Sequence, residues 1–163
     1  MQALGLALRI EAVDPQHPRA RALLSEAAEE EARALYPELF TADAPGPVNP
    51  PLGPRDLYLL AWRGDHAVGC GALRERDAFT AELRRIFVTR QARRDGVARA
   101  VLADLERRAK DLGYHRLVLE TGARQQEALA LYGSGGWRRI AAWGPYVSDP
   151  LSVCLGKSLS HRR

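Results

Sequence analysis

Cysteine occurs only twice in the 163 residues, as Cys70 and Cys154, and both lie in apolar runs. There is no CxxC pair, and the four histidines are scattered along the chain, so the sequence offers no zinc-binding cluster. We therefore predict two buried free thiols rather than a disulfide, which is the usual state in a reducing cytoplasm. No metal is expected in the chemistry.

Long apolar segments are also missing. The longest fully apolar run extends from Leu57 to Trp62, far short of the length that crosses a bilayer. The N-terminus has no basic segment ahead of an apolar stretch, and Arg9 interrupts the apolar residues there, so no export signal is indicated. We expect a cytoplasmic protein with no membrane partner.

Lysine is scarce, with 2 lysines among the 24 basic residues and therefore 22 arginines. The net charge is +4, which is compatible with an anionic ligand or with nucleic acid. The arginines are spread over the whole chain, and neither an RNA-binding aromatic pattern nor a recognition-helix motif is present. We predict no nucleic-acid partner. Length and composition indicate a single domain over residues 1–163.

Several common catalytic motifs are absent. Gly69-Cys70-Gly71 begins like a dinucleotide-binding loop, but Arg74 stands where the third glycine belongs. Gly156-Lys157-Ser158 lacks the upstream glycine of a phosphate-binding P-loop, because residue 151 is leucine. No GxSxG or HExxH pattern occurs. These absences argue against a dehydrogenase, a nucleotide kinase, a serine hydrolase and a zinc protease.

The hydrophobic pattern predicts a mixed sheet with few helices, an α/β (α+β) fold, rather than regular βαβ alternation. Two antiparallel hairpins are expected in the middle of the chain. A proline- and glycine-rich loop over residues 41–56 interrupts the pattern, and we interpret it as a wall or lid of an active site. The expected strands are 4–13, 56–63, 66–74, 80–88, 116–120, 137–143 and 151–155, and the expected helices are 18–35, 97–112 and 124–132.

The most informative segment is Arg93-Arg94-Asp95-Gly96-Val97-Ala98-Arg99, between a predicted strand and an amphipathic helix. Glycine at such a bend lets an anion approach bare backbone amides, and the helix N-terminus favours negative charge. The arginines add positive charge. A phosphate or pyrophosphate site is one interpretation, and an arginine-rich surface turn at the start of a helix is the other.

Two spaced motifs resemble the GCN5-related N-acetyltransferase (GNAT) family. Residues 81–88 followed by Arg93-x-x-Gly96-x-Ala98 are similar to the family's Gln/Arg-x-x-Gly-x-Gly/Ala motif after its fourth strand. Residues 128–132, Ala-Leu-Ala-Leu-Tyr, followed by Gly136-Trp137, are similar to its later helix and strand motif. The resemblance extends over residues 5–157. It implies the GNAT fold: a mostly antiparallel mixed sheet, flanked by helices, with a splayed parallel strand pair at its centre.

The resemblance implies acetyl-CoA as the acyl donor. Its pyrophosphate would lie on the loop formed by Arg93, Arg94, Asp95, Gly96, Val97, Ala98 and Arg99. Its pantetheine arm would pair with the backbone of Ile86, Phe87 and Val88, in a splay whose other side is the strand ending at Leu119-Glu120. Gln125 stands where the family often has an asparagine that contacts this arm, and glutamine keeps the amide but is longer by one methylene, so we expect a shifted or water-mediated contact.

The implied activity is transfer of an acetyl group from acetyl-CoA to a primary amine of a small molecule or peptide, by direct attack in a ternary complex. Glu82 resembles the family's general base, and Tyr132 matches the tyrosine that protonates the CoA sulfur. Both have structural alternatives: Glu82 as an ion-pair partner of Arg84 or Arg74, and Tyr132 as a core aromatic beside its helix neighbours.

A non-catalytic module that binds and senses acyl-CoA is the alternative function. The acceptor amine is not specified by the sequence, because the segments that would surround it vary most in such scaffolds. Tyr36, Pro37 and Tyr146 are candidates for lining its pocket or for structural roles. Glu29 to Glu31 have two interpretations, a solvated helix face, which we favour, and a group that selects a cationic amine. A homodimer is compatible with the resemblance.

Overall fold

Seven strands form one sheet in the order β1-β2-β3-β4-β5-β7-β6, in a computed structural model that describes residues 7–34 and 46–160. The strands are β1 (Leu8–Ala12), β2 (Leu57–Arg63), β3 (His66–Glu75), β4 (Thr80–Val88), β5 (Arg116–Gly122), β6 (Arg138–Arg139) and β7 (Ser152–Ser158). The helices are α1 (Pro18–Ala34), α2 (Val97–Asp111) and α3 (Gln126–Ser134), with short 3-10 turns η2 (Arg90–Ala92) and η3 (Gly144–Tyr146). This element order matches the predicted mixed sheet.

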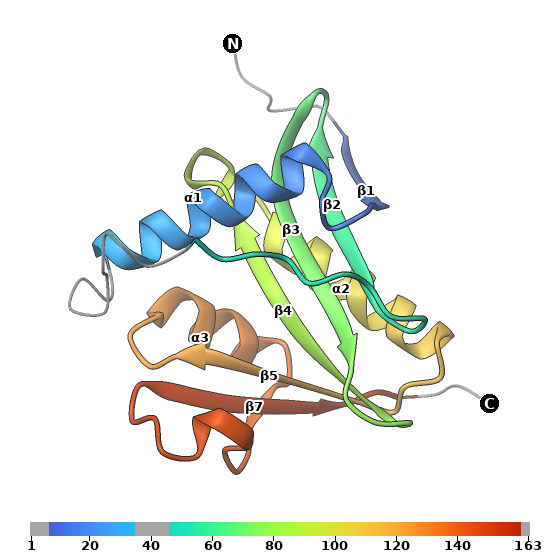
Figure 1. The fold of residues 1–163 in the computed structure, drawn as a ribbon, viewed down its shortest axis with the longest axis vertical. Helices are drawn as coiled ribbons and strands as arrows, with labels where there is room; N and C mark the ends of the chain where they lie inside the picture. Colours follow the sequence, from blue (N-terminus) through green and yellow to red (C-terminus); the bar gives the residue numbers. More distant parts are fainter. Residues whose placement is uncertain (1–6, 35–45, 161–163) are drawn as a thin grey trace.

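Helices cover both faces of the sheet, because alternate strand residues are apolar on each side. α1 lies on one face, where Ala20 and Leu23 pack against Tyr58, Leu60 and Cys70. α2 lies on the opposite face, behind the strands in Figure 1. There its buried stripe, Val97, Val101, Leu102, Leu105 and Ala109, joins the main core. α3 and Tyr132 also pack against that core.

The parallel pair β4–β5 is paired only at its beginning. Thr80, Ala81 and Glu82 face Arg116, Leu117 and Val118 in register, and no pairing continues beyond them. On their other edges β4 stays paired with β3 up to Val88, and β5 stays paired with β7 up to Gly122. Figure 1 shows the two strands diverging from this closed end. The splayed parallel pair predicted from the sequence is therefore present.

A β-bulge lies in β4 where the strands diverge. Cys70 and Ala72 of β3 face Phe87 and Arg84, so β4 carries one more residue than its partner over this stretch. Arg85 takes the strained position, with φ 61°. A bulge bends its strand and increases the local twist, which turns the later half of β4 away from β5.

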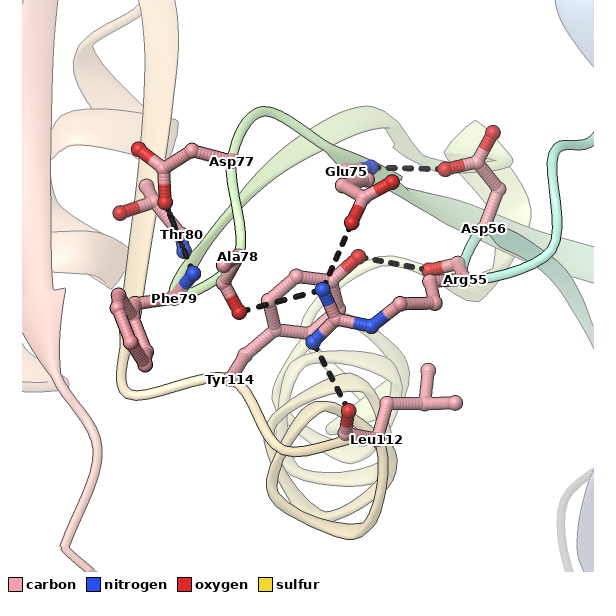
Figure 2. A network of polar contacts seen from close by, with 9 residues as sticks. All are labelled: Arg55, Asp56, Glu75, Asp77, Ala78, Phe79, Thr80, Leu112 and Tyr114. Carbon is pink, nitrogen blue, oxygen red and sulfur yellow. Dashed lines mark hydrogen bonds and ion pairs between the residues drawn. The ribbon is translucent and has the colours of Figure 1, made fainter.

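As they diverge, β4 and β5 form a V, and a polar network lies at its closed end (Figure 2). The Arg55 guanidinium donates to the Glu75 carboxylate at 2.7 Å and to the Leu112 carbonyl at 2.9 Å. It stacks over the Tyr114 ring, and the Tyr114 hydroxyl donates to the Arg55 carbonyl at 2.9 Å. The start of β2, the end of β3 and the end of α2 are thereby tied together. The network thereby fixes the end of the sheet from which β4 and β5 diverge.

One predicted strand was largely wrong. Residues 137–143 form only the two-residue β6, after which Ile140 adds a single backbone bond to Cys154. Gly144, with φ 52°, and Pro145 then divert the chain into η3. Cys70 and Cys154 are both buried free thiols, as predicted. Tyr36, Pro37 and residues 41–45 of the proline-rich loop lie outside the described residues.

Candidate functional site

A cleft of about 1220 Å³ opens at the divergence of β4 and β5. Ordinary ligand pockets measure about 300–1,000 Å³, so this one has room for a large cofactor together with a second molecule. It is lined from both faces of the sheet, by α1 and η3 on one side and by the start of α2 and by α3 on the other. All predicted site residues except Asp95 line it: Glu82, Ile86, Phe87, Val88, Arg93, Arg94, Gly96, Val97, Ala98, Arg99, Gln125 and Tyr132.

The loop before α2 presents backbone amides to this cleft. Arg94 and Gly96 both have left-handed backbone, with φ 65° and 80°, and a Cβ at Gly96 would meet no atom within 4 Å. In the described part of the chain, no side chain caps the start of α2, whose first regular bond is from Ala100 to Gly96. The amides at this helix start are therefore available to an anion.

Arg93 is already engaged by another element. Its guanidinium pairs with the Glu30 carboxylate of α1 at 2.6 Å, and its Nε donates to the Val88 carbonyl at 3.1 Å. The prediction that Glu30 belongs to a solvated face was wrong, since its side chain is only 24% exposed. Arg93 thus connects α1 to the loop. Asp95 turns away from the cleft and pairs with Arg63 at 3.2 Å.

The Glu30–Arg93 pair predicts a pH-dependent stability. The hydrogen bond from Arg93 holds the pKa of Glu30 below its usual 4.5. A depressed folded-state pKa stabilises the protein above the unfolded-state pKa, and this contribution disappears as pH falls through the folded value. We expect Glu30→Gln to lower the melting temperature at pH 7, with the difference from wild type vanishing at acidic pH. A difference independent of pH, measured by thermal unfolding from pH 3 to 8, would contradict this.

Tyr132 lies in the wall of the cleft on α3. It is 5% exposed, and its ring packs edge-on against Trp137 with 5.8 Å between centroids. Burial alone raises the pKa of Tyr132 to about 12. The hydroxyl is therefore a neutral donor throughout the physiological range. Both sequence-based interpretations are compatible with this position, because the ring packs in the core while the residue lines the cleft.

Two carboxylates lie on the α1 face of the sheet, close to the point where β4 and β5 diverge. Glu82 of β4 is 3.8 Å from Arg84, which is one of the ion pairs anticipated for it. Glu120 of β5 accepts a hydrogen bond from Ser152 at 2.9 Å. Burial, reinforced by the charge of Asp149, raises the pKa of Glu120.

Glu120 is the residue that sequence reasoning missed as a candidate for proton transfer. It was placed only in the strand flanking the pantetheine arm. Its side chain lines the cleft, which opens where the pairing of β5 with β4 ends after Val118. A carboxylate near the end of an otherwise apolar buried strand was the available signal, but nothing local indicates which face of the sheet it takes.

The described residues were also compared with the requirements of a metal site and of a membrane-spanning helix. Within residues 7–34 and 46–160, no group of three or more His, Cys, Asp or Glu side chains is arranged to hold a metal ion. No helix in those ranges is long and apolar enough to cross a membrane.

Comparison with known proteins identifies the architecture. Residues 17–136 match the model of the acetyltransferase (GNAT) family. The chain is similar to YsnE, an uncharacterised N-acetyltransferase of Bacillus subtilis, with 38% identity over 109 residues, 66% of this chain and 72% of that one. It is also similar to an IAA acetyltransferase of Azospirillum brasilense, with 37% identity over 103 residues, 63% of this chain and 67% of that one.

A solved structure supports the same assignment. A Klebsiella pneumoniae protein provisionally named an acyl-CoA N-acyltransferase superposes with a TM-score of 0.76 at 28% identity, covering 98% of this chain and all of that one. The family model spans most of the chain, and the splayed parallel pair agrees with it. The chain is therefore an acetyltransferase and belongs to the GNAT family.

Proposed function

We propose that the chain transfers an acetyl group from acetyl-CoA to a primary amine of a small molecule, by direct attack within the cleft. The observation that carries this proposal is the open V between β4 and β5, with uncapped amides at the start of α2 and Tyr132 in its wall. The pyrophosphate binds at the amides from Arg94 to Ala98. Arg94 and Arg99 supply charge, whereas Arg93 acts by holding α1 to the loop through Glu30.

The pantetheine arm lies along the edge of β4 at Ile86, Phe87 and Val88. Beyond Glu82 this edge has lost its pairing with β5, so its peptide groups are available to a strand-like ligand, except the Val88 carbonyl, which already accepts from Arg93. Gln125, at the start of α3, lines the same cleft and lies within the region expected for the arm. The acetyl thioester then reaches the centre of the V. Tyr132 of α3 approaches it from one face of the sheet, and Glu82 and Glu120 approach it from the α1 face.

Tyr132 and the carboxylates divide the chemistry. The amine must lose a proton before or during attack on the thioester carbonyl, and the departing sulfur must be stabilised as its charge develops. Tyr132 donates a hydrogen bond to that sulfur. Glu120 accepts the amine proton, because its raised pKa brings a carboxylate nearer to the working pH. Glu82 holds the incoming ammonium group. No covalent enzyme intermediate is required.

Ligand binding and turnover test this proposal together. Acetyl-CoA at about 100 times its Kd should stabilise the fold by about 2.7 kcal/mol, whereas ATP at the same concentration should stabilise it less. Release of CoA thiol and formation of an N-acetyl product should then follow addition of an amine panel. IAA, which names one relative, is tested as a separate acceptor beside the amine panel. No stabilisation by millimolar acetyl-CoA, or stabilisation with no acetylated product from any acceptor, would contradict the proposal.

The two carboxylates predict different kinetic effects. We expect Glu120→Gln to lower kcat by about 10²–10⁴-fold, the usual contribution of a general base, and to abolish the acidic limb of the pH–rate profile. We expect Glu82→Gln mainly to raise KM for the amine. In wild type the rate should fall as pH decreases through the pKa of Glu120, which lies above the usual 4.5. If Glu82→Gln removes the acidic limb instead, the two roles are exchanged.

A further inference from the structure

Tyr58 of β2 carries a buried hydroxyl whose hydrogen-bonding capacity is not used within the described residues. The residue is 2% exposed and lines the cleft beside α1. Its hydroxyl lies beside the Cys70 thiol and the Asn49 side chain, but it completes no well-formed hydrogen bond with them or with any other group in residues 7–34 and 46–160. Leaving a buried donor without an acceptor costs about 1–3 kcal/mol, and such groups are rare in folded proteins. The hydroxyl is closed to solvent in this structure, so a ligand oxygen satisfies it only when the side chains that cover it shift.

Arg85 lines the same part of the cleft from the bulge of β4. Its Nε donates to the Asn49 side chain at 3.0 Å, and its Nη2 donates to the Val48 carbonyl at 3.2 Å. Asn49 is itself 3% exposed and donates to the Pro15 carbonyl at 3.0 Å. Both partners of Arg85 are neutral. In the described ranges no carboxylate forms an ion pair with this half-buried guanidinium.

The loop and the bulge fix this cation in place. The proline-rich loop passes between Arg85 and the residues before α1, and Asn49 is bonded to both. Positive φ at Arg85 turns its side chain to the α1 face, together with Tyr58 and Cys70. A guanidinium held by neutral acceptors keeps its full charge and donors for an anion, and its preorganisation reduces the cost of binding one.

The part of the cleft on the α1 face of the sheet, where we place the acceptor amine, therefore carries opposite charges at its two ends. Glu82 and Glu120 stand where β4 and β5 diverge, and Arg84 pairs with Glu82 there at 3.8 Å. Burial, and after it the charges of Glu82 and Glu120, raises the pKa of the nearby Tyr146 phenol. Arg85 and the Tyr58 hydroxyl lie farther along the α1 face. The wall that α1 contributes is apolar at Leu23, Leu24 and Ala27. Glu30 and Glu31 of the same helix also line the cleft, and the charge of Glu31 acts on Glu120. An acceptor spanning this surface needs a cationic end, an anionic end and an apolar body.

We infer that the acceptor is a small amine that also carries a carboxylate, an amino-acid-like zwitterion with an apolar side chain. Arg85 and the Tyr58 hydroxyl bind the carboxylate, the ammonium lies at Glu82 and Glu120, and the side chain packs against α1. This inference rests on the proposed function and adds the substrate class to it. A buried water is the competing partner of the Tyr58 hydroxyl. A second cavity of about 10 Å³, lined in part by Tyr58 and Arg85, has room for at most one water.

Matched acceptors test the carboxylate. We would compare L-leucine with L-leucinamide and 3-methylbutylamine, and L-phenylalanine with its amide and phenethylamine, at saturating acetyl-CoA. Loss of a hydrogen bond to a charged group corresponds to about tenfold to hundredfold in affinity. We therefore expect kcat/KM for the better amino acid to exceed that of its amide by at least about tenfold, with the difference in KM. Calorimetric binding of the same amino acid in the presence of CoA gives an activity-independent readout.

Variants separate ligand binding from structure. Tyr58→Phe should weaken amino-acid binding yet leave the melting temperature of the free protein unchanged or higher, because it removes an unsatisfied hydroxyl. Arg85→Gln should erase the preference for the carboxylate, and Arg85→Lys should restore part of it. Arg74→Gln is the control for a nearby cation. Arg74 pairs with Asp56 at 3.7 Å and carries the same charge on the neighbouring strand; it lines the small second cavity with Tyr58 and Arg85 but not the main cleft.

The outcomes distinguish the inference from the proposed function. Acetyl-CoA binding and turnover of the amides or simple amines as fast as of the amino acids would overturn the inference alone. So would a Tyr58→Phe variant that melts lower and binds the amino acid normally, since a bound water would then be the occupant. Failure of acetyl-CoA to bind would overturn the proposed function. A carboxylate preference lost in Arg85→Gln and kept in Arg74→Gln supports the inference.

Discussion

Replacing Tyr132 by phenylalanine should lower kcat for acetyl transfer by about 10²–10⁴-fold. The hydroxyl is the neutral donor in the cleft wall, with its pKa raised to about 12 by burial. Because it stays protonated well above neutral pH, its own ionisation should not reduce the rate up to about pH 10. Acetyl-CoA binding should change little, since the ring and its packing against Trp137 remain. Steady-state kinetics and calorimetry measure the two effects separately.

Tyr114→Phe is the matched control. Tyr114 is fully buried, and its hydroxyl donates to the Arg55 carbonyl in the network at the closed end of the V (Figure 2). Losing this bond should cost about 1 kcal/mol and lower the melting temperature by about 2–4 °C, with kcat unchanged. A Tyr132→Phe variant that loses stability like Tyr114→Phe but retains its rate would show that Tyr132 serves only in packing.

Replacing Gly96 by valine should weaken acetyl-CoA binding by about 100-fold or more. Each charge-assisted hydrogen bond contributes about 1.5–3 kcal/mol, and two such bonds from the loop amides already account for that factor. A side chain at Gly96 projects into open space in front of these amides, where the pyrophosphate is proposed to lie. Isothermal titration with acetyl-CoA measures the loss. An unchanged Kd would mean that the pyrophosphate binds elsewhere.

Gly113→Val separates backbone strain from ligand binding. Gly113 also has left-handed backbone, φ 88°, but it lies at the far end of α2 near Arg55. A non-glycine residue in this conformation costs about 1–2 kcal/mol, so both variants should lower the melting temperature. Only Gly96→Val should lose acetyl-CoA. Equal loss of affinity in both would indicate a general loosening of α2 rather than obstruction of the amides.

The hydrophobic pattern was sufficient to predict most elements. The strand over residues 80–88 was placed at its observed bounds, and the helix beginning at residue 97 differs only at its last residue. Amphipathic periodicity is a local property, so it can be recognised before tertiary contacts are known. The strand predicted over residues 137–143 was mostly wrong, because pairing with β7 ends at Arg139 and Gly144-Pro145 turns the chain.

The local sequence does not specify which side chains pair with one another in the folded chain. Arg93 was expected to face an anion, but it pairs with Glu30, 63 residues earlier in the chain. No sequence motif marks Arg85 or Tyr58 as a site residue, since each is one residue in an ordinary strand. Their shared face depends on a bulge whose extra residue appears only in the β3–β4 register.

The sequence by itself determined the family motifs, the order of elements and the loop whose glycine precedes α2, because these depend on residue types at short spacing. The tertiary structure decided how far β4 and β5 remain paired, and hence the size of the cleft. It also decided which charges are neutralised. Arg93 is paired with Glu30, whereas Arg85 meets only neutral acceptors in the described chain. The physical reason is that charge pairing depends on distance in space, and segments remote in sequence meet only in the folded chain.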